Sequence, residues 1–365
     1  MATSLLCTER MHPRLSFSDA PMRVYWEITR ACALACRHCR AEAAPARAKE
    51  ELDTAEGFRL LEQLAAASPK PHVVLTGGDP LERDDLFALI AHGRSLGLGV
   101  SVSPSATPRL TEDAIRALRE AGVEAISLSI DGADAPAHDG IRGVPGTFER
   151  TLVAGRQARA LGLPFQVNTL VAKETLADVP AIEALARSLG AARWSLFFLV
   201  TVGRGAVLSP ISPDECDGLL GWLAERSAEP GMIITTTEAP HFRRIVSERR
   251  LSVPGRGHAA GIRDGNGILF VSHDGEVFPS GFLPVAAGNV RQGDVLSIYR
   301  EAPLFRVLRD VDGFHGRCGA CEVRSACGGS RARAYLASGD VLGEDPLCTH
   351  QPGAHQPGTD QPRAH

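Results

Sequence analysis

Between residues 24 and 204, short apolar runs alternate with amphipathic stretches. Six runs rich in β-branched or aromatic residues predict strands at residues 24–28, 73–75, 99–102, 125–130, 165–171 and 194–200. Windows that repeat apolar residues every three or four positions predict helices at residues 54–67, 111–121, 148–161 and 176–189. The chain therefore alternates strand and helix.

The helix boundaries carry local signals of their own. Asp53 and Thr111 stand where a side-chain oxygen can cap the first turn of the helix that follows. The glycines expected to end helices in a left-handed conformation are Gly97, Gly122, Gly162 and Gly190. Such strand–helix repeats build a parallel sheet with right-handed crossovers. The predicted fold class is α/β, a partial (βα)6 TIM-like barrel that binds ligands at the carboxyl ends of its strands.

The pattern changes after the sixth repeat. Residues 213–226 predict one more helix, and residues 231–293 are rich in glycine and short β runs, including a hairpin around Asp274 and Gly275. A polar, proline-rich repeat at the end of the chain is expected to be disordered. We divide the chain into an N-terminal extension (1–19), a barrel core (20–228), a small irregular C-terminal iron–sulfur domain (229–350) and a tail (351–365).

Composition narrows the class of protein. The 39 basic and 43 acidic residues give a net charge of −4, which provides no basic groove for nucleic acid and no basic face for an anionic membrane. No apolar run reaches the roughly 18 residues of a membrane helix, and the first residues lack the pattern of a signal peptide. We expect a cytoplasmic enzyme. In that compartment the nine cysteines favour metal or redox sites over disulfides.

The first cysteine group follows the first predicted strand. Cys32, Cys36 and Cys39 place three thiolates within eight residues, which suits an iron–sulfur cluster with one iron left open for a substrate or cofactor. A structural zinc ion is the alternative, and it would need a fourth ligand such as His38.

The second cysteine group lies near the end of the chain and contains Cys318, Cys321, Cys327 and Cys348. Four thiolates can close a tetrahedral site. Zinc and a fully ligated 4Fe–4S cluster both satisfy this chemistry, and the spacing alone does not separate them. The remaining cysteines, Cys7 and Cys216, are expected to have no catalytic role.

The Cys-x3-Cys-x2-Cys spacing after the first strand resembles the radical SAM superfamily. Residues 76–80, Thr-Gly-Gly-Asp-Pro, are similar to its Gly-Gly-Glu motif, with Asp79 where the family usually has Glu. The resemblance covers residues 20–210. It implies that the open iron is chelated by S-adenosylmethionine (SAM). One electron from the cluster then cleaves SAM to a 5′-deoxyadenosyl radical.

The resemblance also implies SAM contacts. The backbone at Gly77 and Gly78 would hold the methionyl amino group, with Asp79 beside it, and His38 would border the adenine. Ser129 and Asn168 are candidates for the ribose if they point inward. An ordinary turn is the alternative for the glycines, and an exposed loop position is the alternative for His38.

The second group is similar to the SPASM/twitch extensions of radical SAM enzymes. This implies an auxiliary 4Fe–4S cluster in place of zinc. Ser280 and Ser330 stand where further cysteine ligands occur in a full SPASM domain, and serine is a poor cluster ligand, so we expect one auxiliary cluster. Its expected role is to pass an electron or to hold the small domain over the barrel mouth.

Together with residues 331–335 and 345–348, the second group looks closest to the radical SAM enzymes of alternative heme and heme d1 biosynthesis. These act on propionates of an iron tetrapyrrole. Hydrogen abstraction from a propionate β-carbon, followed by loss of carbon dioxide and an electron, would leave a vinyl group. The alternatives are a maturase of a ribosomally synthesised peptide and a zinc-stabilised binding protein. A low-potential donor such as flavodoxin or ferredoxin is the expected partner.

Candidates for substrate contacts follow from this interpretation. Arg204 and Arg256 stand in glycine-flanked loops and could pair with propionates, although plain surface positions are the alternative. His241 and His273 are candidate axial ligands to a substrate iron. The aromatic residues of the sixth strand, Trp194, Phe197 and Phe198, are expected in the core.

Overall fold

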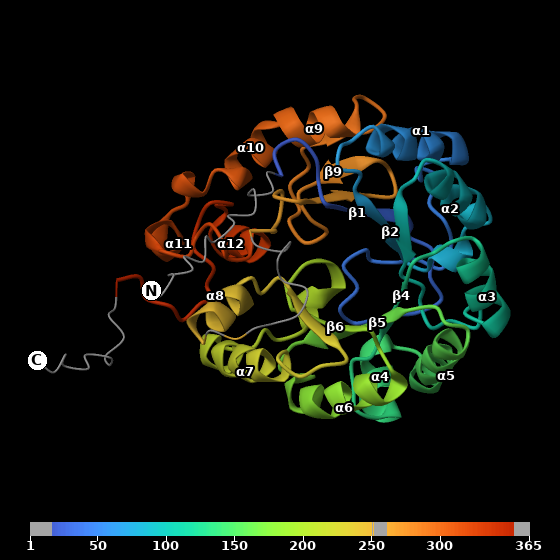
Figure 1. The fold of residues 1–365 in the computed structure, drawn as a ribbon, viewed down its shortest axis with the longest axis horizontal. Coiled ribbons are helices and arrows are strands. Elements are labelled where there is room, and N and C mark those ends of the chain that lie inside the picture. The colour runs from blue at the N-terminus through green and yellow to red at the C-terminus, as the bar shows by residue number, and fades with distance from the viewer. Residues whose placement is uncertain (1–16, 250, 252–260, 354–365) are drawn as a thin grey trace, which may run out of the picture.

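The computed structural model describes residues 17–249, 251 and 261–353. Its strands form one curved sheet in the order β10-β9-β8-β1-β2-β3-β4-β5-β6-β7, with helices on the outside (Figure 1). Cys7, Arg256 and most of the expected disordered tail lie outside the described residues.

The six predicted strands are all present and pair in parallel, each with the next. They are β1 (Arg23–Thr29), β2 (His72–Gly77), β3 (Gly99–Val102), β4 (Ile126–Ser129), β5 (Phe165–Val171) and β6 (Arg193–Phe198). This arrangement confirms the α/β class and the partial barrel.

The outer layer consists of the helices that connect these strands. They are α1 (Thr54–Ala65), α2 (Leu86–Ser95), α3 (Glu112–Glu120), α4 (Ala135–Arg142), α5 (Thr147–Ala160), α6 (Val179–Leu189) and α7 (Pro213–Arg226). Asp53 and Thr111 cap α1 and α3, and the four glycines have positive φ, as predicted. Two short 3-10 turns, η1 (Pro80–Glu82) and η2 (Leu176–Asp178), lie between them.

The two faces of each strand have different surroundings. In β1, Val24, Trp26 and Ile28 are fully buried against the helices, and Trp26 packs on Gly57 of α1. The alternate residues, such as Tyr25, therefore face the barrel interior. In β6 the same alternation buries Trp194 and Phe198 and turns Phe197 inward, where it is half-buried. The expectation of a core position is wrong for Phe197, because it lies on the inner face.

Residues beyond 228 extend the same sheet at both edges. β7 (Ile233–Thr237) pairs in parallel with β6, and β8 (Ile268–Val271) pairs in parallel with β1. β9 (Glu276–Phe278) runs antiparallel to β8, which confirms the predicted hairpin. The sheet is continuous across the expected domain boundary, which stays a prediction.

The remaining elements lie along the side of the barrel between β9 and α7 (Figure 1). They are α8 (His241–Glu248), β10 (Gly288–Asn289), α9 (Val295–Glu301), α10 (Pro303–Arg309), η4 (Val311–Gly313), α11 (Gly316–Ala320) and α12 (Arg331–Ser338). Among the described helices, none has both the length and the apolar character needed to cross a membrane.

Candidate functional site

The first cysteine group lies on the loop that leaves the carboxyl end of β1. Cys32 and Cys36 are buried, Cys39 is half-buried, and all three thiols are free and share one small apolar cluster. The backbone N–H groups of Leu34 and Ala43 each donate to a sulfur, of Cys32 and Cys39 respectively, at 3.4 Å. Burial raises the pKa of the Cys32 thiol, and the hydrogen bond from Leu34 opposes that shift.

A buried cation stands beside this group. One nitrogen of Arg142, at the end of α4, lies 3.8 Å from the sulfur of Cys36, and another lies 2.5 Å from a carboxylate oxygen of Asp131. Burial raises the pKa of the Cys36 thiol, and the positive charge of Arg142 opposes that shift. The arginine thus supplies charge that an anionic cluster needs. Sequence reasoning missed the contact between Arg142 and Cys36, because Arg142 follows β4 and Cys36 follows β1.

Two glycines bring the end of β2 directly against the cysteine loop. Gly77 has a φ of +144°, and a Cβ there would lie 2.3 Å from the carbonyl oxygen of Thr29. A Cβ on Gly78 would lie 2.3 Å from that of Ala31. Only glycine permits this approach. The glycines therefore have a packing role, and a role in holding SAM would be additional to it.

Asp79 is occupied by contacts within the protein. Its fully buried carboxylate accepts hydrogen bonds from the hydroxyl of Thr107 at 2.7 Å and from the backbone N–H groups of Ser105 and Leu81 at 3.2 Å. Burial raises its pKa, and the bonds from Thr107 and Ser105 oppose the shift. The hydroxyl of Ser105 lies 3.6 Å from the sulfur of Cys32. Asp79 thus fastens the loop after β3 beside the cysteines.

Ser129 and Asn168 stand side by side. They are partners in the β4–β5 register, and both are half-buried between the buried outward residues of their strands. Both side chains therefore face the barrel interior near the carboxyl ends of the strands, as a ribose contact requires. The side-chain oxygen of Asn168 accepts a bond of 2.6 Å from Gln166, also on the inner face.

His38 is not an exposed loop residue. Its ring is half-buried, with one nitrogen 4.0 Å from a carboxylate oxygen of Asp131. Burial and the nearby charge of Arg142 lower its pKa to about 4, so the ring is neutral at pH 7. A neutral, half-buried ring beside the cysteine loop is suited to packing against a flat group.

Arg204 packs on the cysteine loop from η3 (Gly203–Val207). Its backbone N–H donates to the carbonyl of Cys39 at 3.1 Å, and its side chain reaches the carbonyl of Ala43 at 3.4 Å. Its other two guanidinium nitrogens are buried and have no hydrogen-bond partner among the described residues. They could receive a carboxylate.

A second charged cluster links the cysteine loop to the β8–β9 hairpin. Glu27, a buried inward-facing residue of β1, pairs with Arg40 at 2.5 Å and with His273 at 2.8 Å. The guanidinium of Arg40 also lies over the ring of Phe270. His273 is thereby engaged, which does not support the expectation of an axial ligand. In the sequence, a glutamate inside an otherwise apolar strand could have indicated this charged cluster.

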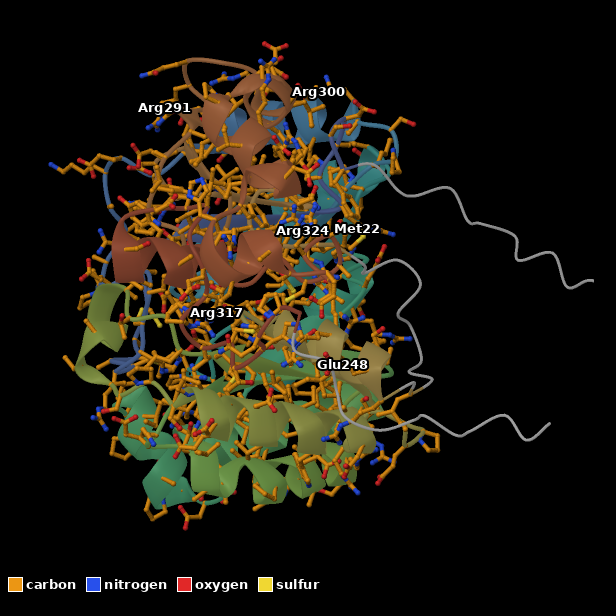
Figure 2. The ribbon with its side chains drawn as sticks, turned by 90° about the vertical axis from the view of Figure 1, so that its left-hand side faces the viewer. Met22, Glu248, Arg291, Arg300, Arg317 and Arg324 are labelled. Carbon is orange, nitrogen blue, oxygen red and sulfur yellow. The ribbon has the colours of Figure 1, made fainter. Side chains whose placement is uncertain are left out.

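The second cysteine group comes together in three dimensions. Cys318 in α11, Cys321, Cys327 and Cys348 all line one cavity, together with His241. Burial raises the pKa of Cys327 to about 12 and that of Cys348 to about 11, so these thiols are protonated at pH 7 unless a metal binds. Arg317 and Arg324, labelled in Figure 2, line the same cavity.

Arg331 places a positive charge against the second group. Its side chain is fully buried, lies 3.5 Å from the sulfur of Cys318 and stacks on the ring of Phe314. The backbone N–H of Asp345 donates to the same sulfur at 3.5 Å. A buried arginine and a backbone N–H group thus lie against one cysteine sulfur.

A buried carboxylate organises the surroundings of the second group. Asp345 accepts hydrogen bonds from His241 at 2.9 Å, from Arg333 at 3.0 Å and from the backbone of Ser330 at 2.7 Å. Arg333 and His241 hold the pKa of Asp345 below its usual range against the effect of burial. His241 is therefore bound inside the protein, and its expected role as an axial ligand has no support.

The two serines at expected ligand positions have structural roles. Ser280 accepts from the backbone N–H groups of Phe282 and Leu283, and Ser330 caps α12 and donates to Glu238. Both hydroxyls are thus engaged in hydrogen bonds within the chain.

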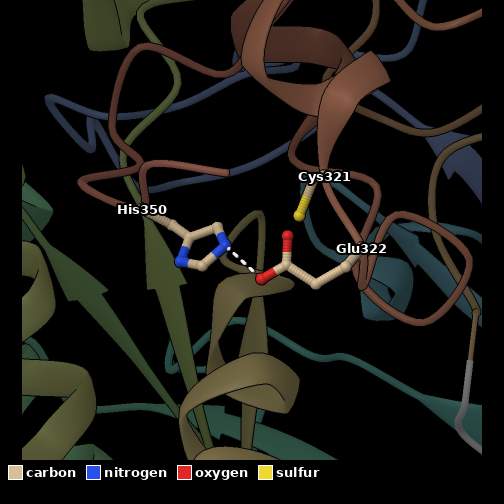
Figure 3. Close-up of side chains that lie close together, drawn as sticks. All are labelled: Cys321, Glu322 and His350. Atoms are coloured by element: carbon tan, nitrogen blue, oxygen red, sulfur yellow. Dashed lines mark hydrogen bonds and ion pairs between the residues drawn. The ribbon is translucent and has the colours of Figure 1, made fainter. Parts of the chain in front are cut away.

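The described residues contain one compact set of possible ligand atoms for a single metal ion. These belong to Cys321, Glu322 and His350, which lie within 4.8 Å of one another, with His350 bonded to Glu322 at 2.8 Å (Figure 3). Sulfurs around a tetrahedral zinc ion lie about 3.8 Å apart. Within the described ranges, neither cysteine group brings three sulfurs that close together.

Comparison with known proteins extends these observations. The model of the Radical SAM superfamily matches residues 26–186. The AdoMet-dependent heme synthase of Methanosarcina barkeri is 40% identical over 348 residues, which cover 93% of this chain and 99% of that protein. The AdoMet-dependent heme synthase of Oleidesulfovibrio alaskensis is 38% identical, over 92% of this chain and 89% of the relative.

Among solved structures, SuiB of Streptococcus suis bound to S-adenosylmethionine is similar in fold. The TM-score is 0.71 at 15% identity, and the match covers 91% of this chain and 78% of that one. The similarity therefore extends over both the barrel and the C-terminal part.

Proposed function

Because the chain belongs to the radical SAM superfamily, as an enzyme that uses SAM and a 4Fe–4S cluster, we propose that it oxidatively decarboxylates propionates of an iron tetrapyrrole in heme biosynthesis. The observation that carries this proposal is the 40% identity to a heme synthase over 93% of this chain and 99% of the relative. Such coverage includes the C-terminal part, whereas the superfamily model ends at residue 186.

Cys32, Cys36 and Cys39 would hold the SAM-binding cluster. Their free thiols, the N–H donors and the charge of Arg142 fit an iron–sulfur group. When bound, the cluster and SAM supply a 5′-deoxyadenosyl radical that removes hydrogen from the substrate.

The SAM contacts are assigned from the same geometry. The Gly77–Gly78 backbone would bind the methionyl amino group, Ser129 and Asn168 the ribose, and His38 the adenine. Asp79 would act as a positioning residue, because its carboxylate already accepts three hydrogen bonds.

Arg204 would bind a carboxylate at the barrel mouth. Its two unpartnered nitrogens, among the described residues, lie beside the loop of Cys39. A planar guanidinium can bind a carboxylate through two parallel hydrogen bonds. This supports a contact with SAM or with the reacting propionate.

The second cysteine group would hold an auxiliary 4Fe–4S cluster. The observation that supports this is the buried guanidinium of Arg331, which contacts the sulfur of Cys318. The reaction needs an electron acceptor, because a propionate that has lost a β-hydrogen must release carbon dioxide and one further electron to become a vinyl group. The auxiliary cluster would take that electron, and flavodoxin or ferredoxin would supply the electron for SAM cleavage.

The test is an anaerobic reaction of reconstituted protein with SAM, a low-potential reductant and iron coproporphyrin III. We expect heme, with one carbon dioxide and one 5′-deoxyadenosine for each vinyl group formed. If 5′-deoxyadenosine accumulates while the porphyrin keeps all its carboxylates, the substrate assignment is wrong. A peptide substrate would then be the next candidate.

A further inference from the structure

The inner face of the barrel is polar along its length. Outward-facing strand residues are buried, whereas many inward-facing ones, such as Tyr25 and Gln166, are half-buried; Glu27 and Ser195 are inward-facing residues that are buried. Polar inward-facing residues come from all six predicted strands and include Arg23, His72, Ser101, Ser127, Gln166 and Arg193. A barrel closed only by its own packing would carry apolar residues there.

Two arginines stand at the end of the barrel opposite the cysteines. Arg23 is the first residue of β1 and Arg193 the first residue of β6. Four strands separate β1 from β6 in the sheet, and the curvature brings them to opposite sides of the barrel (Figure 1). Arg23 is in register with His72 and Arg193 with Gln166, so both arginine side chains face the barrel interior at this end.

Neither arginine has an acidic partner among the described residues. Arg23 contacts the hydroxyl of Tyr25 at 3.4 Å, and no ion pair includes Arg23 or Arg193. The nearby carboxylate of Glu124 pairs instead with Arg94 and His72. Two inward-facing guanidinium groups without an acidic partner among the described residues can each donate hydrogen bonds to a bound anion.

Aromatic side chains supply a second observation on the same inner face. Tyr25 and Phe270 are partners in the β1–β8 register, and Phe270 contacts Phe278 with ring centroids 6.2 Å apart. Across the barrel, the ring of Phe197 lies 6.4 Å from that of Phe282. Phe270 is buried beneath Arg40, but the half-buried rings of Tyr25 and Phe197 lie on two sides of the inner face and suit a flat, largely apolar ligand.

We propose that Arg23 and Arg193 bind the carboxylates that a tetrapyrrole substrate keeps, on the edge of the macrocycle that does not react. The proposal rests on the proposed function. Arg23 lies six residue steps along β1 from Thr29, after which the cysteine loop begins, and this corresponds to about 20 Å. A carboxylate bound at the arginines is therefore remote from the radical, and the opposite edge points toward the cysteine loop.

The test measures binding of iron coproporphyrin III by absorption titration of reconstituted protein. Wild type is compared with Arg23→Gln, Arg193→Gln and the double variant. Removing either charged hydrogen-bond donor should weaken binding at least tenfold, and the double variant should bind about a hundredfold more weakly. Arg193→Lys should retain most of the affinity. Arg187→Gln, which changes a half-buried arginine on the outer helix α6, is the matched control and should bind like wild type.

Two further measurements separate the possible outcomes. Iron content and substrate-free formation of 5′-deoxyadenosine should equal wild type in all variants, which shows that they are folded and loaded. The tetramethyl ester of the porphyrin should bind all proteins equally and weakly.

Each unexpected result would contradict a different part of the proposal. If wild type converts iron coproporphyrin III and the double variant binds it equally well, the arginine site is wrong. If the variants lose affinity for the acid and the ester alike, the arginines act through packing, and the site is again wrong. If wild type neither binds nor converts the porphyrin, the proposed function itself has failed.

Discussion

The two cysteine groups are built in opposite ways. The first takes three cysteines from one loop, and its glycine partners follow on the very next strand. The second takes four cysteines spread over residues 318–348 and needs α8, α11 and α12 around it. A three-cysteine group leaves a position for another ligand, whereas four cysteines can fill a cluster. The three-cysteine site is therefore specified mainly by the local spacing of its ligands. The four-cysteine site depends on tertiary folding to bring its ligands together.

The two cysteine groups share one structural feature. In each, a buried arginine contacts a sulfur, Arg142 at Cys36 and Arg331 at Cys318. Their partners differ. Arg142 also pairs with the buried Asp131, whereas the other bonds of Arg331 go to backbone carbonyls. The same charge is thus held by an ion pair in one place and by the backbone in the other.

The largest expected effect comes from removing the first group. Replacing Cys32, Cys36 and Cys39 together by alanine should remove about four irons per chain and abolish 5′-deoxyadenosine formation, because no cluster remains to deliver the electron. Iron analysis and chromatography of the products measure both. Cys216→Ala, at a buried cysteine outside both groups, is the control and should keep iron and activity. Deoxyadenosine formation by the triple variant would contradict the assignment.

Removing one cysteine of the second group should separate SAM cleavage from heme formation. Cys348→Ala should lower the iron content from about eight to about four while cleavage of SAM continues, because the first group is intact. Heme formation should fall by at least tenfold, since the electron acceptor is lost. Metal analysis of the wild-type protein provides the opposing outcome: one zinc and four irons per chain would show that the second group is a zinc site.

Replacing the buried arginine of each cysteine group should have a smaller effect, on the stability of the chain. Arg142→Gln should destabilise the chain by about 3–5 kcal/mol, because it leaves Asp131 as an uncompensated buried charge. Arg331→Gln removes no ion pair and should lower the free energy of unfolding by about 1–3 kcal/mol. Anaerobic urea titrations compare the two. Equal losses would mean that the ion pair contributes nothing beyond its hydrogen bonds.

The smallest effect concerns a contact between the barrel and the C-terminal part. Arg291, labelled in Figure 2, pairs with Glu56 of α1 at 2.7 Å, and its hydrogen bond is the main cause that lowers the pKa of Glu56 to about 2. Because the folded pKa is depressed, the stabilisation is present above pH 4.5 and is lost as the pH falls toward 2. The pair is partly exposed, so its contribution is below about 1 kcal/mol.

Glu56→Gln should remove this contribution. Above pH 5 the variant should unfold at slightly lower urea concentration than wild type, and the difference should shrink as the pH falls below about 4.5. A difference that grows in acid would contradict the assigned ion pair.

The sequence predicts local features of this molecule well. The bounds of β3, β5 and α7 agree with the predicted ranges, because strand alternation, helix periodicity and capping residues are encoded within a few positions. The hairpin at Asp274 was also predicted from the sequence. By contrast α2 was missed, because apolar residues lie on several of its sides and the contrast between two faces is weak.

Long-range features escaped prediction for a physical reason. That β8 pairs with β1, or that Arg142 reaches Cys36, depends on which distant segments meet, and no short window encodes it. Phe197 was misplaced because its neighbours on both sides are core residues, so composition alone suggested the core. The residues assigned to SAM remain predictions, with Asp79 the one whose observed bonds argue for an indirect role.

The pairing of β8 with β1 has a consequence for how the protein is made. The two strands are separated by more than two hundred residues of chain, yet they hydrogen-bond in register from Arg23 to Trp26. At about 5–20 residues per second, a ribosome needs roughly 10–50 s to deliver β8 after β1 has emerged. During that interval the edge of β1 stays unpaired, and the loop with the first three cysteines is already synthesised. Closure of this side of the sheet is therefore a late event in the life of the nascent chain.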